Sequence, residues 1–419
     1  MKKVIRLYFS FQFFFSLLLW LPIFYEFQKR IGLNDSEIFS IQSIYYTVFC
    51  LLEIPTGLLA DRLGYRLCMG LGGGVVALSN LLPIFAPTYG GMLFHFILIA
   101  LGRSLISGSS SAYIFEYIKR HSLTGQPDEY KKIEGRARSY SLFGKVLLWG
   151  MIGSLMQWHL TLPYWLSFVG TGISVFFAIA LPSLGNLSVP SLGTLSVPSA
   201  GTLSGSSDIK PKWNQDFKAI TGLLRTSPVL VLIMLQGVAL FTAARIAQVN
   251  LFQPILKAKA FGVPSFGWIM SLMTLFEALG SAWPHGLRSK LTDWNAVFFL
   301  TLTAASALSL IPFSAQIATI ACLCIFSLAN GFAFPIQKQL LNQAITVSRY
   351  RATLLSIESI VDRAVCAWVA LLLGSYMKSG AINAFLIHSS LATIVFMIII
   401  FTLGRMQRAR ASSRLKSLT

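Results

Sequence analysis

Apolar stretches of about 20 residues, the length that spans a bilayer core, alternate with short polar segments along the whole chain. An α-helix of this kind satisfies its own backbone hydrogen bonds inside lipid. The pattern therefore predicts an all-α membrane protein with about twelve transmembrane helices. The expected spans are 5–28, 36–60, 67–87, 90–118, 134–157, 163–181, 228–256, 265–287, 295–313, 317–342, 352–377 and 381–404.

The composition supports a chain surrounded by a lipid bilayer. Of its 419 residues, 55% are hydrophobic and only 12% are charged, whereas a soluble domain carries about 25% charged residues. The net charge of +19 would suggest nucleic acid in a soluble protein. Here the basic residues lie between apolar spans, so the excess follows from membrane topology and no nucleic-acid partner is expected.

The Lys and Arg residues also indicate the orientation. If both termini lie inside, the inner segments hold 24 of these residues, Arg138 among them, and the outer segments hold 5. Cytoplasmic loops of membrane proteins carry such an excess. Both termini are therefore expected in the cytoplasm.

A long polar segment divides the chain after the sixth span. It contains three imperfect octapeptides, PSLGNLSV, PSLGTLSV and PSAGTLSG, whose Pro, Ser and Gly residues oppose a packed core. We expect an N-terminal six-helix bundle at 1–181, a flexible cytoplasmic linker at 182–226, a C-terminal six-helix bundle at 227–404 and a basic cytoplasmic tail at 405–419.

The most specific motif follows the second span. It reads Gly57-x-Leu59-Ala60-Asp61-Arg62-x-Gly64-x-Arg66. Gly57 permits close helix packing, Gly64 allows a tight turn, and Asp61 can accept hydrogen bonds at a helix N-terminus. The run resembles the signature loop of the major facilitator superfamily, except at Tyr65, where the family often has a basic residue. The resemblance implies two six-helix bundles around a central cavity, with substrate bound near the midplane.

The same resemblance implies an inner gate. Arg62 and Arg66 would pair with an acid at the inner end of the fourth span, where Glu116 lies, and would hold the inner side closed in the outward-facing state. Glu53 lies two helical turns before Asp61 and is assigned to the same network. The alternative is a basic loop that only sets the topology.

Further segments resemble one bacterial branch of the superfamily, whose members are often linked to metabolite or siderophore transport. The branch implies a multi-pass protein of the bacterial inner membrane, and we expect a monomer. Drug-proton antiporters usually carry a Gly-Pro-rich motif in the fifth span. Here Gly144, Gly150 and Gly153 are present without a proline, which weakens a drug-efflux interpretation. The resembling segments are Glu53 to Gly57, Ser107-Gly108 with Ala112, Gln253-Pro254 with Gly262, and Arg351 to Ser356.

Several charges lie inside the predicted spans, where each costs about 2.5–3.5 kcal/mol and so indicates a functional site. Arg103 lies near the midplane, and Arg245 and Glu277 are expected to pair across the cavity. Gln248 shares a helix face with Arg245. The expected substrate pathway comprises Arg103, Lys145, Arg245, Gln248, Asn250 and Glu277.

Glu358 and Asp362 lie one helical turn apart on the eleventh span, beside Arg363. Two carboxylates on one face repel, so a cation or a proton should accompany them. All three are expected to act in gating. Glu277 and Asp362 are the candidate proton carriers, because burial favours the neutral form of a carboxyl group. Lys338 is assigned a structural role.

The deep cations favour an anionic substrate, since arginine binds carboxylate and phosphate in bidentate fashion. We expect a proton-coupled transporter of a small organic anion, such as a metabolite or a carboxylate siderophore, with import favoured. Efflux of drugs or other hydrophobic compounds is the alternative. A non-transporting receptor or assembly factor would not need the inner-gate motif.

Enzymatic activity, a cofactor and a metal are not expected. The glycines from Gly70 to Gly74 fall inside an apolar span, where they serve helix packing rather than phosphate binding. The histidines offer no helical pair suited to a metal ion.

Overall fold

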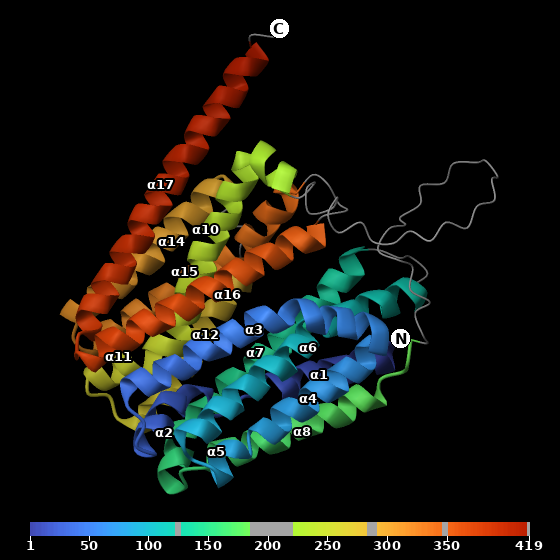
Figure 1. The fold of residues 1–419 in the computed structure, drawn as a ribbon, viewed down its shortest axis with the longest axis vertical. Helices are drawn as coiled ribbons and strands as arrows, with labels where there is room; N and C mark the ends of the chain where they lie inside the picture. The colour runs from blue at the N-terminus through green and yellow to red at the C-terminus, as the bar shows by residue number, and fades with distance from the viewer. Residues whose placement is uncertain (122–126, 185–220, 283–290, 346–350, 417–419) are drawn as a thin grey trace, which may run out of the picture.

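The computed structural model describes residues 1–121, 127–184, 221–282, 291–345 and 351–416, which form helices and no strand. Two groups of helices lie side by side (Figure 1), as the two-bundle fold predicts. The first contains α1 (Lys2–Ser16), η1 (Leu21–Ile23), α2 (Phe24–Arg30), α3 (Asp35–Leu63), α4 (Tyr65–Ser79), α5 (Leu82–Phe85), α6 (Tyr89–His121), α7 (Pro127–Trp158) and α8 (Leu162–Ala180). The second contains α10 (Pro228–Arg245), η2 (Ile246–Leu251), α11 (Phe252–Ala258), α12 (Val263–Ala282), α14 (Asp293–Leu310), η3 (Ile311–Phe313), α15 (Gln316–Ala344), α16 (Arg351–Lys378) and α17 (Ile382–Lys416). Most of the expected linker at 182–226 lies outside the described residues.

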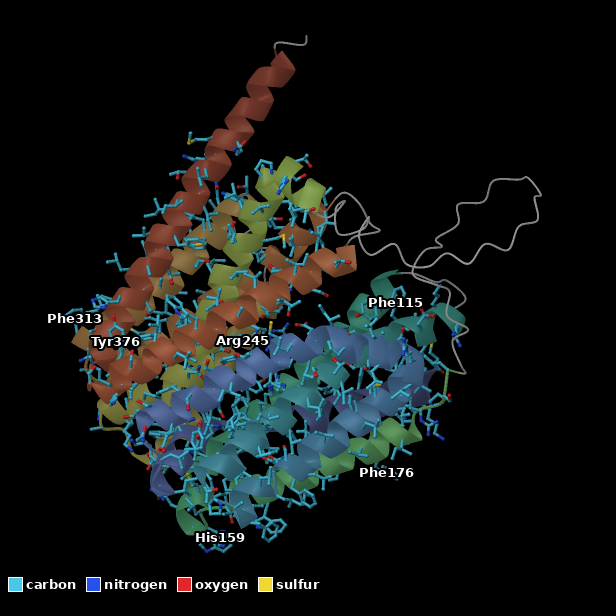
Figure 2. The ribbon with its side chains drawn as sticks, viewed as in Figure 1. Phe115, His159, Phe176, Arg245, Phe313 and Tyr376 are labelled. Atoms are coloured by element: carbon cyan, nitrogen blue, oxygen red, sulfur yellow. The ribbon has the colours of Figure 1, made fainter. Side chains whose placement is uncertain are left out.

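The bundles present an apolar surface. Ten helical segments in the described ranges are long and apolar enough to cross a membrane. Two more long helices, α7 and α16, occupy the places of the fifth and eleventh expected spans and carry more polar residues. Large apolar side chains such as Phe176 and Phe313 are exposed on the sides of the molecule (Figure 2), where lipid would cover them.

The first helix of each bundle is irregular. After α1 the chain loses its helical hydrogen bonding, and the N–H of Leu19 donates instead to Ser167 Oγ at 2.8 Å. In the second bundle, α10 ends at Arg245 and continues as the π-helical segment η2. Such breaks inside a membrane require other partners for the backbone and often mark functional sites.

Glycines set the closest helix approaches, although not all where the sequence predicted. A Cβ atom at Gly72 would collide with the Gly102 carbonyl, so the packing role expected for the glycine-rich stretch is confirmed there. Gly64 has φ +89° and forms the predicted turn between α3 and α4. In this conformation Gly57 makes no such close contact, because a Cβ there would meet nothing within 4 Å. The end of α3 is not covered at this position.

Two ends of the molecule can be distinguished. The linker end carries the turn at Gly64 and the chain ends at 184 and 221, on either side of the linker (Figure 1). The far end carries the connections 31–34, 159–161, 259–262 and 379–381.

Candidate functional site

A cavity of about 240 Å³ lies between the two bundles. Its walls come from η1 and α7 of the first bundle and from η2 and α12 of the second. Its lining combines apolar side chains with an equal number of polar and charged ones. The lining residues are Leu21, Arg138, Ser141, Leu142, Lys145, Trp149, Gln248, Val249, Met270, Met273, Thr274 and Glu277.

Glu277 is the acid of this cavity, and both bundles contact it. Its Oε2 accepts a hydrogen bond of 2.9 Å from Gln248 Nε2. Its Oε1 lies 3.8 Å from Arg138 Nη2, across the boundary between the bundles. At this distance, with 47% of the Arg138 side chain exposed, the ion pair is loose and open to exchange with another anion. The expected pairing of Glu277 with Arg245 is therefore wrong.

The backbone of Glu277 is held by a close helix contact. A Cβ at Gly331 on α15 would collide with the Glu277 carbonyl, and one at Gly280 would collide with the Leu328 carbonyl. Small residues at these two positions let α12 and α15 approach closely. The position of the Glu277 carboxylate therefore depends on a glycine of a neighbouring helix.

Lys145 lies on the opposite wall, in the first bundle. Its Nζ is 5.4 Å from the centre of the Trp149 ring, an arrangement in which the ring face attracts the cation. The indole N–H of Trp149 donates to the Leu18 carbonyl at 3.3 Å, in the break after α1. Arg103, Arg138 and Glu277 all lie within electrostatic range of Lys145.

Arg245 lies near the middle of the molecule (Figure 2) and binds Asp362. Its Nη2 is 2.9 Å from Asp362 Oδ2, and Thr242 Oγ1 donates to Asp362 Oδ1 at 3.0 Å. Asp362 is only 3% exposed. The packing of α10 on α16 places Arg245 next to Asp362 and not next to α12. Arg245 therefore forms its ion pair within its own bundle.

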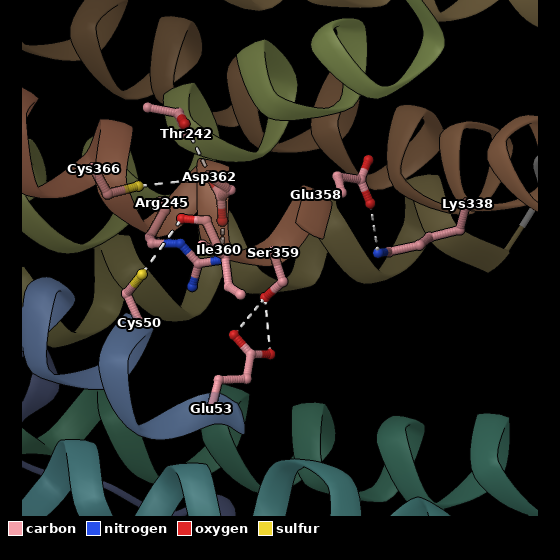
Figure 3. A network of polar contacts seen from close by, with 10 residues as sticks. All are labelled: Cys50, Glu53, Thr242, Arg245, Lys338, Glu358, Ser359, Ile360, Asp362 and Cys366. Carbon is pink, nitrogen blue, oxygen red and sulfur yellow. Dashed lines mark hydrogen bonds and ion pairs between the residues drawn. The ribbon is translucent and has the colours of Figure 1, made fainter. Parts of the chain in front are cut away.

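The second acid of α16 also has a cation (Figure 3). Lys338 Nζ lies 3.5 Å from Glu358 Oε2 and 4.9 Å from the centre of the Phe241 ring. Glu358 is 2% exposed, and its Oε1 has no hydrogen-bond partner among the described residues. A cation thus accompanies each of the two neighbouring carboxylates.

Contacts between α3 and α16 join the bundles beside this pair (Figure 3). Ser359 Oγ donates to Glu53 at 3.0 and 3.1 Å from its two carboxylate oxygens. Arg363 places its Cζ 3.8 Å from the centre of the Phe49 ring. Glu53 therefore bonds across the bundle boundary, in addition to lying before the signature loop.

At the far end, Gln253 of α11 ties the two broken helices together. Its Oε1 accepts from the backbone N–H groups of Tyr25 and Glu26 at 3.0 and 3.2 Å, and its Nε2 donates to the Leu21 carbonyl at 3.1 Å. Lys257 Nζ lies 3.0 Å from Glu26 Oε2. Both bundles contribute to this cluster, so it holds the far end closed.

Glycines complete the closure. A Cβ at Gly267 would collide with the Trp149 carbonyl, one at Gly153 with the Val263 carbonyl, and one at Gly150 with the Trp268 ring. Helices α7 and α12 therefore touch through their backbones at the far end. Of the three glycines that the sequence compared with an antiporter motif, Gly150 and Gly153 serve this contact, whereas Gly144 faces the Phe13 ring of α1.

The expected latch at the linker end is not formed. Among the described residues, no ion pair joins Glu116 to Arg62 or Arg66. Arg66 donates instead to the Ile179 carbonyl near the end of α8, where helix carbonyls lack intrahelical partners. The Asp61 side chain lies outside the described part of the structure.

The remaining predicted residues occupy different surroundings. Asn250 is fully buried and does not line the cavity. Arg103 is exposed beside the Tyr45 hydroxyl. Sequence reasoning missed Arg138, which was counted among the inner-loop cations but lines the cavity. Its position three residues before Ser141, on one helix face with Lys145, was the available signal.

Comparisons with known proteins agree with this architecture. Residues 6–361 match the family model described as Major Facilitator Superfamily. The nucleoside transporter NupG superposes with a TM-score of 0.74 at 13% identity, covering 95% of this chain and 99% of that chain. A POT family transporter in complex with a thioalcohol-conjugated peptide gives 0.69 at 16% identity, covering 96% and 95%. At such identities the likeness shows the fold alone.

Two curated relatives match a short part of the chain. Methyl viologen resistance protein SmvA, from two strains of Salmonella typhimurium, is 30% identical over 84 residues. The match covers 20% of this chain, and the chain spans only 17% of the length of those relatives.

Proposed function

Because the chain belongs to the Major Facilitator Superfamily, it is a multi-pass transporter rather than an enzyme, and we propose that its cargo is a small organic anion. A metabolite or a carboxylate siderophore fits this class. Protons are the proposed coupling ion, and the bacterial inner membrane is the proposed location. Import is the proposed direction.

The observation that carries this proposal is the charge of the cavity. Arg138 and Lys145 line it and Arg103 acts on it electrostatically, whereas Glu277 is the acid among the lining residues. A cavity with surplus positive charge attracts anions and repels cations. The loose Arg138–Glu277 pair leaves Arg138 able to turn towards a bound carboxylate.

Alternating access is supported by the difference between the two ends. Backbone contacts and the Gln253 cluster close the far end, while Gly57 and Glu116 at the linker end have no contact across the bundles among those described. With the linker in the cytoplasm, this conformation opens towards the cytoplasm. Closure of the signature loop against Glu116 would then belong to the opposite state.

Glu277 and Asp362 are the proposed proton carriers. Each carboxylate faces an arginine, Arg138 at 3.8 Å and Arg245 at 2.9 Å. Protonation of Glu277 would free Arg138 for the substrate anion and so couple the two ions. Anion uptake should then be accompanied by alkalinisation of the medium, and this proton movement should be lost in Glu277→Gln, whose neutral amide cannot carry a proton.

A second candidate is proton-antiport efflux of drugs or other hydrophobic compounds. The similarity of 84 residues to the methyl viologen resistance protein SmvA favours it. For a cationic cargo the cavity cations would be unfavourable. Replacing Lys145 should then increase transport, whereas it should decrease transport of an anion.

The test compares the culture media of a deletion strain carrying either the wild-type protein or Lys145→Glu. We expect an organic anion to disappear from the medium only with the wild-type protein. Accumulation of the anion in the medium would indicate export instead of import. A neutral or cationic compound whose transport survives Lys145→Glu would overturn the proposal. Lys378→Glu, an exposed far-end position, is the matched control and should behave like the wild type.

A further inference from the structure

Three cations between the bundles have no carboxylate at ion-pair distance among the described residues. They are Arg103 on α6, Lys145 on α7 and Arg363 on α16. Each lies against an aromatic side chain instead. Lys145 faces Trp149, Arg363 faces Phe49 and Arg103 lies beside Tyr45.

Arg103 and Arg363 converge on one pair of rings from opposite bundles. Tyr45 and Phe49 are one turn apart on α3, with ring centres 6.2 Å apart in an edge arrangement. Arg103 lies beside the Tyr45 hydroxyl and Arg363 lies 3.8 Å over Phe49. The two guanidinium groups also act on each other electrostatically. An aromatic ring attracts a cation but does not neutralise it, so this arrangement keeps its like-charge repulsion.

Hydrogen-bonding capacity remains free at this point. Arg363 Nε is buried and has no partner among the described residues. Arg245 Nε is also without a partner there, but Asp362 neutralises the charge of Arg245. A carboxylate placed between Arg103 and Arg363 would relieve their repulsion and accept the planar donor pattern of arginine.

Lys145 forms a second position, separate from this arginine pair. It lines the cavity over Trp149, while Arg103 and Arg363 do not line it. Arg103 acts electrostatically on both Lys145 and Arg363, so it is close to both positions. The three unpaired cations thus come from α6, α7 and α16 and form one cluster.

Building on the proposed function, we infer that the substrate carries two separated anionic groups, one bound at Lys145 and the other between Arg103 and Arg363. A dicarboxylate or a similar compound fits these two positions. Once the first anionic group is bound, the second binds more favourably, because the molecule loses its translational and rotational freedom only once. Since Arg363 belongs to the second bundle, such a substrate also contacts both halves of the transporter.

The experiment measures binding to the full-length protein in detergent by the shift of its thermal unfolding. The probes are α,ω-dicarboxylates from malonate to pimelate, the monocarboxylates of equal carbon number, and inorganic sulfate. Sulfate carries two charges at one centre and tests whether separation matters. We expect one dicarboxylate length to bind about tenfold more tightly than its monocarboxylate and sulfate to resemble the monocarboxylates.

Variants assign the two positions. Lys145→Gln and Arg363→Gln should each remove the dicarboxylate advantage and leave monocarboxylate binding, while Lys378→Gln should retain it. If Arg363→Gln does not fold, Arg363→Lys, which keeps the charge and loses the planar donors, should reduce the advantage. Equal binding of dicarboxylates, monocarboxylates and sulfate would overturn this inference and leave the proposed anion transporter standing. Binding of no anion by the folded protein would overturn both.

Discussion

The two bundles differ in how four cations near their boundary are neutralised. In the C-terminal bundle, Arg245 and Lys338 each face a carboxylate of α16. In the N-terminal bundle, Lys145 and Arg103 face an aromatic ring or a hydroxyl. A cation that is already paired with a carboxylate attracts a ligand anion only weakly. Removing one partner of such a pair leaves an uncompensated buried charge. The paired cations Arg245 and Lys338 therefore serve mainly the folded structure. Lys145 and Arg103, together with the unpaired Arg363 of the C-terminal bundle, remain available for an anion.

The largest effect is expected from breaking a C-terminal pair. Asp362→Asn would leave the Arg245 cation without its counter-charge and should cost about 3–5 kcal/mol of stability. Thermal unfolding in detergent measures this loss. The double variant Asp362→Leu with Arg245→Met removes both charges and should recover most of the stability. If Asp362→Asn melts with the wild type, the pair does not stabilise the fold.

A smaller effect is expected at Gly331, which allows α15 to pack closely against the backbone of Glu277. Gly331→Val would push against the Glu277 carbonyl and should cost about 1–3 kcal/mol through overpacking. It should also weaken substrate binding, because Glu277 and its bond to Gln248 would shift. Gly108→Val is the control, since a Cβ there meets nothing within 4 Å. Equal melting temperatures of the two variants would contradict the packing argument.

Lys145→Gln should separate binding from stability. We expect the substrate concentration at half-maximal transport to rise about tenfold, equivalent to about 1.4 kcal/mol, with an unchanged melting temperature. Lys145 has no carboxylate partner in the described structure, so its removal strands no opposite charge. A loss of stability like that of Asp362→Asn would erase the distinction between the bundles.

The smallest effect is expected at the far-end rim. Lys257 and Glu26 form an ion pair that is partly exposed, so Lys257→Gln should cost about 0–1 kcal/mol. The difference in melting temperature should shrink further as salt screens the pair. A large, salt-independent loss would mean that this contact stabilises the fold as strongly as the buried pairs.

The sequence predicted the helices because lipid imposes long apolar runs, and the signature loop identified the fold because glycines and charges recur there at fixed spacing. Which charges pair was harder to foresee. The rotation of each helix about its axis determines which side chains face each other, and the apolar pattern does not give this rotation precisely. In the structure, α10 and α16 turn Arg245 towards Asp362 rather than towards Glu277 on α12. Arg138 was assigned to an inner loop because α7 begins with polar residues and has no sharp apolar boundary.

The backbone contact between α7 and α12 at the far end has an electrical consequence. Gly153 and Gly267 bring the two helices together without side chains between them, which leaves little room for water or ions. If water enters the cavity from the linker end, most of the membrane voltage falls across this thin seal. Moving one elementary charge across the seal then changes the electrical free energy by about 2.3 kcal/mol for every 100 mV of membrane potential. The same glycines that close the path thus make the seal an insulator against ion leak, and they make the movement of a charged cargo sensitive to voltage.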